Sequence, residues 1–186
     1  MPIKPEILKQ RAVAKSRLFQ IEQLELRFSN GVERTYERLA PSGYGAVAVV
    51  PLIDTGEVLL IQEYSAGMDE YQWGLPKGAV DPGENPLEAA NRELMEEAGF
   101  GAGQLHYLKS VCPSPSYMQR GIDIVLAEEL YEKSLPGDEP EPLARMTWPL
   151  DALGDLLSRG DVRDSVSIAG LFLARDYLAT RGELTG

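Results

Sequence analysis

The sequence predicts an α/β domain built in layers, preceded by a short antiparallel β hairpin. Residues 46–53 are almost entirely apolar, which is typical of a strand buried on both faces. A capped amphipathic helix begins after Asn85, and further strand patterns follow it. Strands that alternate with helices indicate a layered α/β or α+β domain.

The N-terminal hairpin is predicted from alternating side chains. Residues 19–28 (FQIEQLELRF) alternate apolar with polar residues, residues 29–31 (SNG) have the composition of a turn, and residues 32–39 form the returning strand. Residues 41–43 (PSG) are expected to be a hinge, so we divide the chain into a hairpin segment, 1–42, and a main domain, 43–186. A two-stranded hairpin is marginally stable alone, so this one must pack on another surface.

The main domain is expected to continue with elements separated by Gly- and Pro-rich segments. Strands are predicted at 46–53, 58–64, 105–111, 122–130 and 145–148. Helices are predicted from residue 86, at 150–158 and at 166–179. Turns or loops are predicted at 54–56, 67–82 and 134–142.

The amino-acid composition disfavours several classes of function. The chain has 186 residues and a net charge of -11, which disfavours binding to nucleic acid. It contains no apolar run long enough for a membrane span, and residues 1–15 do not resemble a secretory signal. Cys112 is the only cysteine, which is consistent with a reducing cytoplasm, and we expect it to pack near the sheet. His106 is the only histidine, so multi-histidine zinc sites are excluded and carboxylates are the expected acid–base groups.

The predicted helix after Asn85 has well-defined ends. Asn85 suits the N-cap, Pro86 the first helical position, and Glu88 completes a capping box, while Gly99 suits a left-handed C-terminal cap. The apolar residues recur at helical spacing on one face, which is therefore expected to be core: Leu87, Ala90, Leu94 and Ala98.

The same helix carries an unusual concentration of acid. Residues 78–107 contain six carboxylates and one cation, Arg92. Acidic helix faces are commonly just solvated, but like charges at helical spacing repel, and a solvated face would intersperse lysines. Uncompensated carboxylates suit a hard divalent cation such as Mg²⁺, which prefers oxygen ligands and bridges phosphates.

The residues around this helix follow the pattern G-x5-E-x7-R-E-L-x-E-E-x-G-F, with the fixed positions Gly78, Glu84, Arg92, Glu93, Leu94, Glu96, Glu97, Gly99 and Phe100. This pattern resembles the Nudix box, the signature of the Nudix hydrolase family, at every specified position. The resemblance implies an α/β/α sandwich around a mixed sheet. It also implies Mg²⁺-dependent hydrolysis, with Mn²⁺ as a substitute, of a nucleoside diphosphate linked to another moiety.

Site roles follow from the box and from an acidic loop at 137–142. Gly78 would allow the backbone to approach a metal or phosphate closely, and Arg92 would brace neighbouring carboxylates. The loop has the composition of a solvated connection, but related pyrophosphatases carry a Glu-x-Glu loop here that supplies a base and a metal ligand. The expected catalytic residues are Arg92, Glu96, Glu97 and Glu139. The expected metal ligands are Glu93, Glu96, Glu97, Glu141 and Lys77, the last through its backbone carbonyl.

Several segments outside the box resemble the ADP-ribose pyrophosphatase branch and the bacterial ADP compounds hydrolases: residues 36–38, 58–64, 74–78, 137–142 and 166–173, with Pro115 fifteen residues after Phe100. The resemblance implies cleavage of ADP-ribose to AMP and ribose 5-phosphate, with NADH and diadenosine polyphosphates as further substrates. A different nucleotide sugar, such as GDP-mannose, and a non-catalytic nucleotide sensor are the alternatives.

The substrate pocket is expected to use aromatic rings and arginines, since rings stack on bases and guanidinium groups pair with phosphate. The candidates are Tyr36, Arg38, Tyr64, Trp73, Tyr117 and Arg120. We also expect a homodimer in which the hairpin, 1–42, crosses to the partner and carries Tyr36 and Arg38 to the neighbouring site. The alternative is a hairpin that folds back on its own domain.

Overall fold

The computed structural model describes residues 2–41, 43–53 and 56–183 and divides into two compact units. The first unit contains residues 1–43 and 112–121, and the second contains 44–111 and 122–186. Ser42 of the predicted hinge and Asp54 and Thr55 of the predicted turn lie outside the described residues. No helix in the described ranges has the length and hydropathy needed to cross a membrane.

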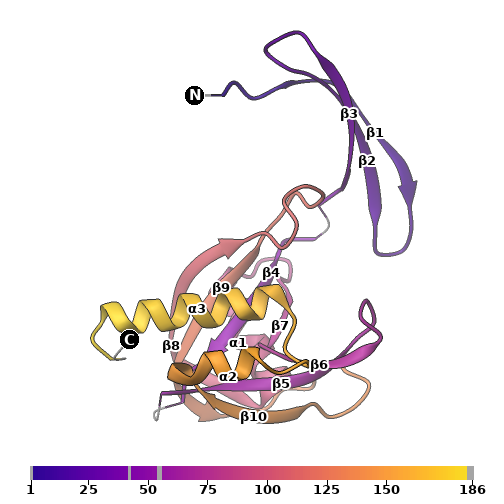
Figure 1. The fold of residues 1–186 in the computed structure, drawn as a ribbon. Coiled ribbons are helices and arrows are strands. Elements are labelled where there is room, and N and C mark those ends of the chain that lie inside the picture. Colours follow the sequence, from indigo (N-terminus) through magenta and orange to yellow (C-terminus); the bar gives the residue numbers. More distant parts are fainter. Residues whose placement is uncertain (1, 42, 54–55, 184–186) are drawn as a thin grey trace. The chain divides into compact units, whose positions relative to one another are not determined.

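The first unit is a three-stranded antiparallel sheet in the order β1-β2-β3 (Figure 1). Its strands are β1 (Glu6–Lys15), β2 (Gln20–Arg27) and β3 (Glu33–Leu39). The predicted β2–β3 hairpin is confirmed, and its turn places Gly31 at φ 80°, a conformation that favours glycine. β1 was not predicted, because a strand exposed along its whole length carries no alternation of apolar and polar residues.

The segment 112–121 joins this first sheet although it comes from the middle of the chain. The Leu39 amide donates to the Tyr117 carbonyl at 2.8 Å, and an Arg120 guanidinium nitrogen donates to the Gly43 carbonyl at 2.6 Å. Cys112 lies in this segment and is exposed, so the expectation that it packs near the sheet was wrong.

The second unit contains a mixed sheet and a smaller antiparallel sheet. The mixed sheet has the order β7-β4-β9-β8, in which β4 (Ala46–Pro51) and β9 (Ile122–Glu132) are parallel. β7 (Lys77–Ala79) and β8 (Phe100–Val111) complete it. The smaller sheet has the order β10-β5-β6, formed by β10 (Ala144–Pro149), β5 (Glu57–Ser65) and β6 (Glu70–Gly74).

Helices cover both faces of the mixed sheet, as an α/β/α sandwich requires (Figure 1). In β4, Ala48 and Val50 face a core shared with α2 (Leu153–Leu157) and α3 (Ser165–Thr180). Val47 and Val49 face the opposite core, which includes apolar residues of α1 (Pro86–Glu93). A 3-10 turn, Leu150–Ala152, leads into α2. The prediction that β4 is buried on both faces is confirmed.

The segment predicted as loop at 67–82 instead contains two short strands, β6 and β7. Their glycines suggested turns, but each marks a close approach of another group. A Cβ at Gly74 would lie 2.8 Å from the Ser167 hydroxyl of α3, and one at Gly78 would overlap the Glu93 carboxylate. Glycine inside a strand commonly has this meaning.

Candidate active site

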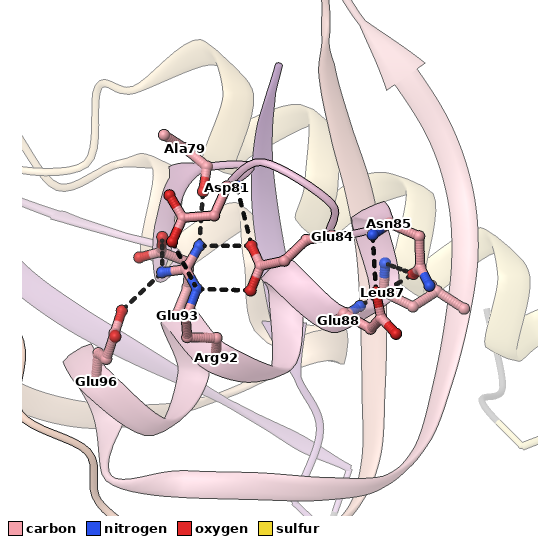
Figure 2. Close-up of polar contacts among 9 residues, drawn as sticks. All are labelled: Ala79, Asp81, Glu84, Asn85, Leu87, Glu88, Arg92, Glu93 and Glu96. Atoms are coloured by element: carbon pink, nitrogen blue, oxygen red, sulfur yellow. Dashed lines mark hydrogen bonds and ion pairs between the residues drawn. The ribbon is translucent and has the colours of Figure 1, made fainter. Parts of the chain in front are cut away.

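The helix that carries the acidic residues begins as the sequence predicts and ends differently. The Asn85 side chain accepts hydrogen bonds from the Leu87 and Glu88 amides, and Glu88 bonds back to the Asn85 amide (Figure 2). After Glu93 the helix widens into a π-helical turn, Leu94–Ala98. Gly99 closes it at φ 74° with its amide bonded to the Leu94 carbonyl. The capping box and the left-handed cap are confirmed, and the π turn is new; such turns often occur at functional sites.

Arg92 joins the acidic residues of this helix to the loop before it (Figure 2). Its guanidinium donates to Glu84 at 2.9 and 3.0 Å, to Glu93 at 2.7 Å and to Glu96 at 2.9 Å. It also donates to the Ala79 carbonyl at 2.8 Å. The predicted bracing by Arg92 is therefore present. The bonds to Arg92 lower the pKa of Glu84, and these carboxylates further raise the pKa of Arg92.

Glu93 and Glu97 are buried, with exposed fractions of 7% and 9%. Burial raises the pKa of Glu93 despite its ion pair with Arg92. Burial also raises the pKa of Glu97, to about 8, although its carboxylate accepts the Lys77 amide at 2.8 Å. Two carboxyl groups whose charged form is disfavoured are suited to a cation that would compensate the charge.

Lys77 contributes more than backbone. Its ammonium pairs with Glu63 of β5 at 2.6 Å, and this pairing raises the pKa of Lys77 against the opposing effect of its burial. In the described part of the chain, the basic side chains beside the acidic cluster are Lys77 and Arg92, and each is thus already paired with a carboxylate.

The acidic loop lies against the box residues. Glu139 is close enough to Glu93 to contribute to the raised pKa of that group. Glu141 accepts a hydrogen bond from the Tyr71 hydroxyl of β6, and this bond raises the pKa of Tyr71. The Tyr71 ring also packs edge-on against Tyr64, with centroids 5.5 Å apart.

The carboxylates of the acidic helix and of the acidic loop line one cavity of about 630 Å³: Glu93, Glu96, Glu97, Glu139 and Glu141. The described residues of its wall include two basic side chains and eight acidic ones: Glu63, Asp81, Glu93, Glu96, Glu97, Asp138, Glu139 and Glu141. Among residues 2–41, 43–53 and 56–183, no three acidic, histidine or cysteine side chains already converge as a metal cage. The donor chemistry nevertheless fits Mg²⁺, since the donors are carboxylate oxygens, those of Glu93 and Glu97 are buried, and Gly78 leaves space for the Glu93 carboxylate.

The predicted substrate residues divide between the two units. Tyr64 lines the acidic cavity, and Tyr64 and Trp73 both line a second cavity beside it. The other four candidates belong to the first unit: Tyr36, Arg38, Tyr117 and Arg120. Within that unit Arg38 is paired with Glu22 at 3.1 Å, and Tyr36 is half exposed beside Phe28.

Three residues of the site were missed by sequence reasoning: Glu63, Tyr71 and Gln72. They lie on paired strands, where Glu63 is opposite Gln72 and Tyr64 is opposite Tyr71. Because β6 was interpreted as loop, no register could be proposed for it. The alternation in residues 70–74 (EYQWG) was the available signal.

The fold and this acidic site define a Nudix hydrolase. A family model described as the NUDIX domain matches residues 44–168. A second model, described as the NudE-type Nudix hydrolase N-terminal domain, matches residues 5–38. The chain therefore belongs to the Nudix hydrolase family.

Individual members of the family show which Nudix hydrolases this chain resembles. The chain is 48% identical to the ADP compounds hydrolase NudE of Escherichia coli (strain K12) over 181 aligned residues, and the alignment covers 97% of each chain. It is 29% identical to an ADP-ribose pyrophosphatase of Mycobacterium tuberculosis (strain ATCC 25618 / H37Rv) over 157 aligned residues. This alignment covers 83% of this chain and 75% of the relative. A crystal structure of an ADP compounds hydrolase superposes with a TM-score of 0.92 at 47% identity, over 99% of each chain.

Proposed function

We propose that this Nudix hydrolase cleaves the diphosphate linkage of ADP compounds in an Mg²⁺-dependent reaction. ADP-ribose, cleaved to AMP and ribose 5-phosphate, is the first expected substrate, and NADH and diadenosine polyphosphates are further ones. The relatives named ADP compounds hydrolase and ADP-ribose pyrophosphatase support the ADP moiety.

The observation that carries the metal requirement is the charge of the cavity. Eight acidic side chains against two basic ones, both already paired, would repel an anionic diphosphate. Divalent cations bound in the cavity would make its charge attractive to the diphosphate. The proposed ligands are Glu93, Glu96, Glu97, Glu141 and the Lys77 carbonyl, and Mn²⁺ is the expected substitute.

The chain's own groups would prepare these ligands for catalysis. Arg92 holds Glu93 and Glu96 in place through short bonds, and the Lys77 amide orients Glu97. Cations held by these ligands would neutralise the charge of the diphosphate and would acidify the attacking water. Glu139, which lines the same cavity without belonging to the box, would accept the proton from that water.

Turnover of a panel tests this proposal. Purified protein is incubated with ADP-ribose, NADH, a diadenosine polyphosphate and GDP-mannose, with Mg²⁺ or with chelator, and the products are identified by mass. We expect AMP from the ADP compounds only when Mg²⁺ is present. Glu93→Gln should lower the rate by orders of magnitude without loss of folding, while Glu37→Gln, an exposed change in β3, should not. Preferred cleavage of GDP-mannose would contradict the ADP preference, and tight nucleotide binding without products would indicate a sensor.

We further propose that residues 1–42 dimerise the protein and that residues 43–186 form the hydrolase domain. The exposed apolar side chains of the first unit support this, among them Ile7, Val13 and Phe19. Pairing with a second copy would bury them and cover the open sheet edges. Tyr36 and Arg38 would then reach the neighbouring active site.

Light scattering tests the dimer. The full chain should be dimeric at micromolar concentration, and deletion of residues 1–42 should yield monomers with little activity although the box carboxylates remain. A fully active monomer of the intact chain would show that the first sheet does not serve dimerisation.

A further inference from the structure

A second cavity of about 440 Å³ adjoins the acidic one in the same unit. The two share Glu63, Tyr64 and Lys77 as lining residues. Its size falls in the range of small-molecule sites. A substrate whose diphosphate lay in the acidic cavity could therefore extend one of its two halves into this one.

Gln72 of β6 is the unusual residue of this cavity. It is only 8% exposed, and its Oε1 atom is buried without a hydrogen-bond partner in the described part of the chain. Its Nε2 atom donates to the Tyr71 carbonyl at 3.4 Å, a long and therefore weak hydrogen bond that favours this orientation of the amide. A buried acceptor left unpaired costs about 1–3 kcal/mol, a cost that a ligand could relieve.

The other charged groups of the cavity are already occupied. Arg163 pairs with Glu70 at 2.6 Å, and Lys77 pairs with Glu63 at 2.6 Å. The Asp164 carboxylate caps α3 through the Val166 and Ser167 amides and the Ser167 hydroxyl. Among the described residues that line this cavity, no unpaired cation is thus available to hold a phosphate.

The remaining lining is suited to a flat, uncharged group. Ile61, Met68 and Trp73 supply apolar surface, and Gln72 supplies one acceptor. A flat heterocycle with an exocyclic N–H donor, such as a reduced nicotinamide, satisfies both requirements, because its ring buries apolar area and its N–H meets the unpaired oxygen once the weakly held Gln72 amide turns toward the cavity.

We propose that this cavity binds the N–H-bearing heterocycle in the distal half of dinucleotide substrates, the half beyond the ADP, and that Gln72 determines the specificity for it. The inference rests on the proposed function, because it takes the diphosphate to lie in the acidic cavity. It adds a subsite that ADP-ribose, which has no distal base, leaves empty.

The test compares NADH, its reduced 3-acetylpyridine analogue, which lacks the carboxamide N–H, and ADP-ribose. For the wild type we expect a KM for the analogue about three- to tenfold above that for NADH, the range of one neutral hydrogen bond. Gln72→Met keeps the length of the side chain but removes the acceptor. In this variant the KM for NADH should rise until it equals the KM for the analogue. The KM for ADP-ribose should stay within about twofold, as should all values in the control Gln104→Met, a change on β8 outside both cavities.

Each other result decides against the subsite. Equal KM values for NADH and the analogue in the wild type would overturn it, whether or not the variant folds. An equal loss for ADP-ribose in Gln72→Met would place the shared adenosine here instead. If the wild type hydrolyses none of the three, the proposed function fails, and the subsite is judged separately by NADH fluorescence in chelator. In that assay Gln72→Met must weaken NADH binding by a similar factor, and unchanged binding would refute the inference.

Discussion

Replacing Glu97 by glutamine should stabilise the metal-free protein. The Glu97 carboxylate is buried, and its pKa is raised from 4.5 to about 8, chiefly by burial. Glutamine keeps the size of the side chain and an oxygen that can accept the Lys77 amide, which lies 2.8 Å away in the wild type. The substitution therefore removes the cost of a buried charge while it keeps the hydrogen bond.

The pH dependence of this effect has a definite sign. Between pH 4.5 and about 8 the folded protein keeps a proton on Glu97 that the unfolded chain releases. The contribution of Glu97 to wild-type stability therefore falls as pH rises through this window, and it is lost completely above the window. At about 1.4 kcal/mol per pKa unit, the shift sets a ceiling of about 5 kcal/mol. Relaxation and water entry reduce such penalties, so we expect Glu97→Gln to gain about 2–4 kcal/mol at pH 8.5 and almost nothing at pH 4.5.

Denaturant unfolding in chelator at both pH values measures this gain. Both tryptophans, Trp73 and Trp148, belong to the second unit, so their fluorescence reports the unfolding of the unit that contains Glu97. Glu37→Gln, an exposed change in the first unit, is the control for loss of one negative charge. Saturating Mg²⁺ should stabilise the wild type more than the variant. A variant no more stable than the wild type at pH 8.5 in chelator would refute the argument from burial.

Three further substitutions probe how the carboxylates are positioned. In Gly78→Ala the new Cβ would overlap the Glu93 carboxylate, so activity should fall by at least about tenfold. The thermal midpoint should change little, because the end of the Glu93 side chain can move. A kcat equal to that of the wild type would show that the close approach has no catalytic role. Tyr71→Phe removes the hydrogen bond to Glu141 and should raise the Mg²⁺ concentration for half-maximal rate severalfold. Adding Tyr71→Phe to Glu141→Gln should have no further effect. Additive effects would show that Tyr71 does not act through Glu141. Glu139→Gln should lower kcat while the Mg²⁺ requirement stays unchanged, whereas an unchanged rate would assign the base to the box.

The sequence by itself determined the local parts of this protein. The capping box at Asn85, the cap at Gly99 and the contacts of Arg92 with Glu93 and Glu96 all join residues one to five positions apart. Helix geometry places such neighbours together whatever the rest of the chain does. The apolar run of β4 likewise required burial on both faces, and the alternation of residues 19–28 required a strand.

Only the tertiary structure decided which distant groups meet at the site. Tyr71 and Glu141 are 70 positions apart, and Lys77 meets Glu63 because β5 and β7 belong to neighbouring sheets. Sheet register depends on pairing between separate segments, so the local sequence of β6 could not reveal that Gln72 lies opposite Glu63. Burial of Glu97 and the raised pKa that follows are also collective, since packing of the whole unit excludes water from a residue that by sequence alone would lie on a solvated face.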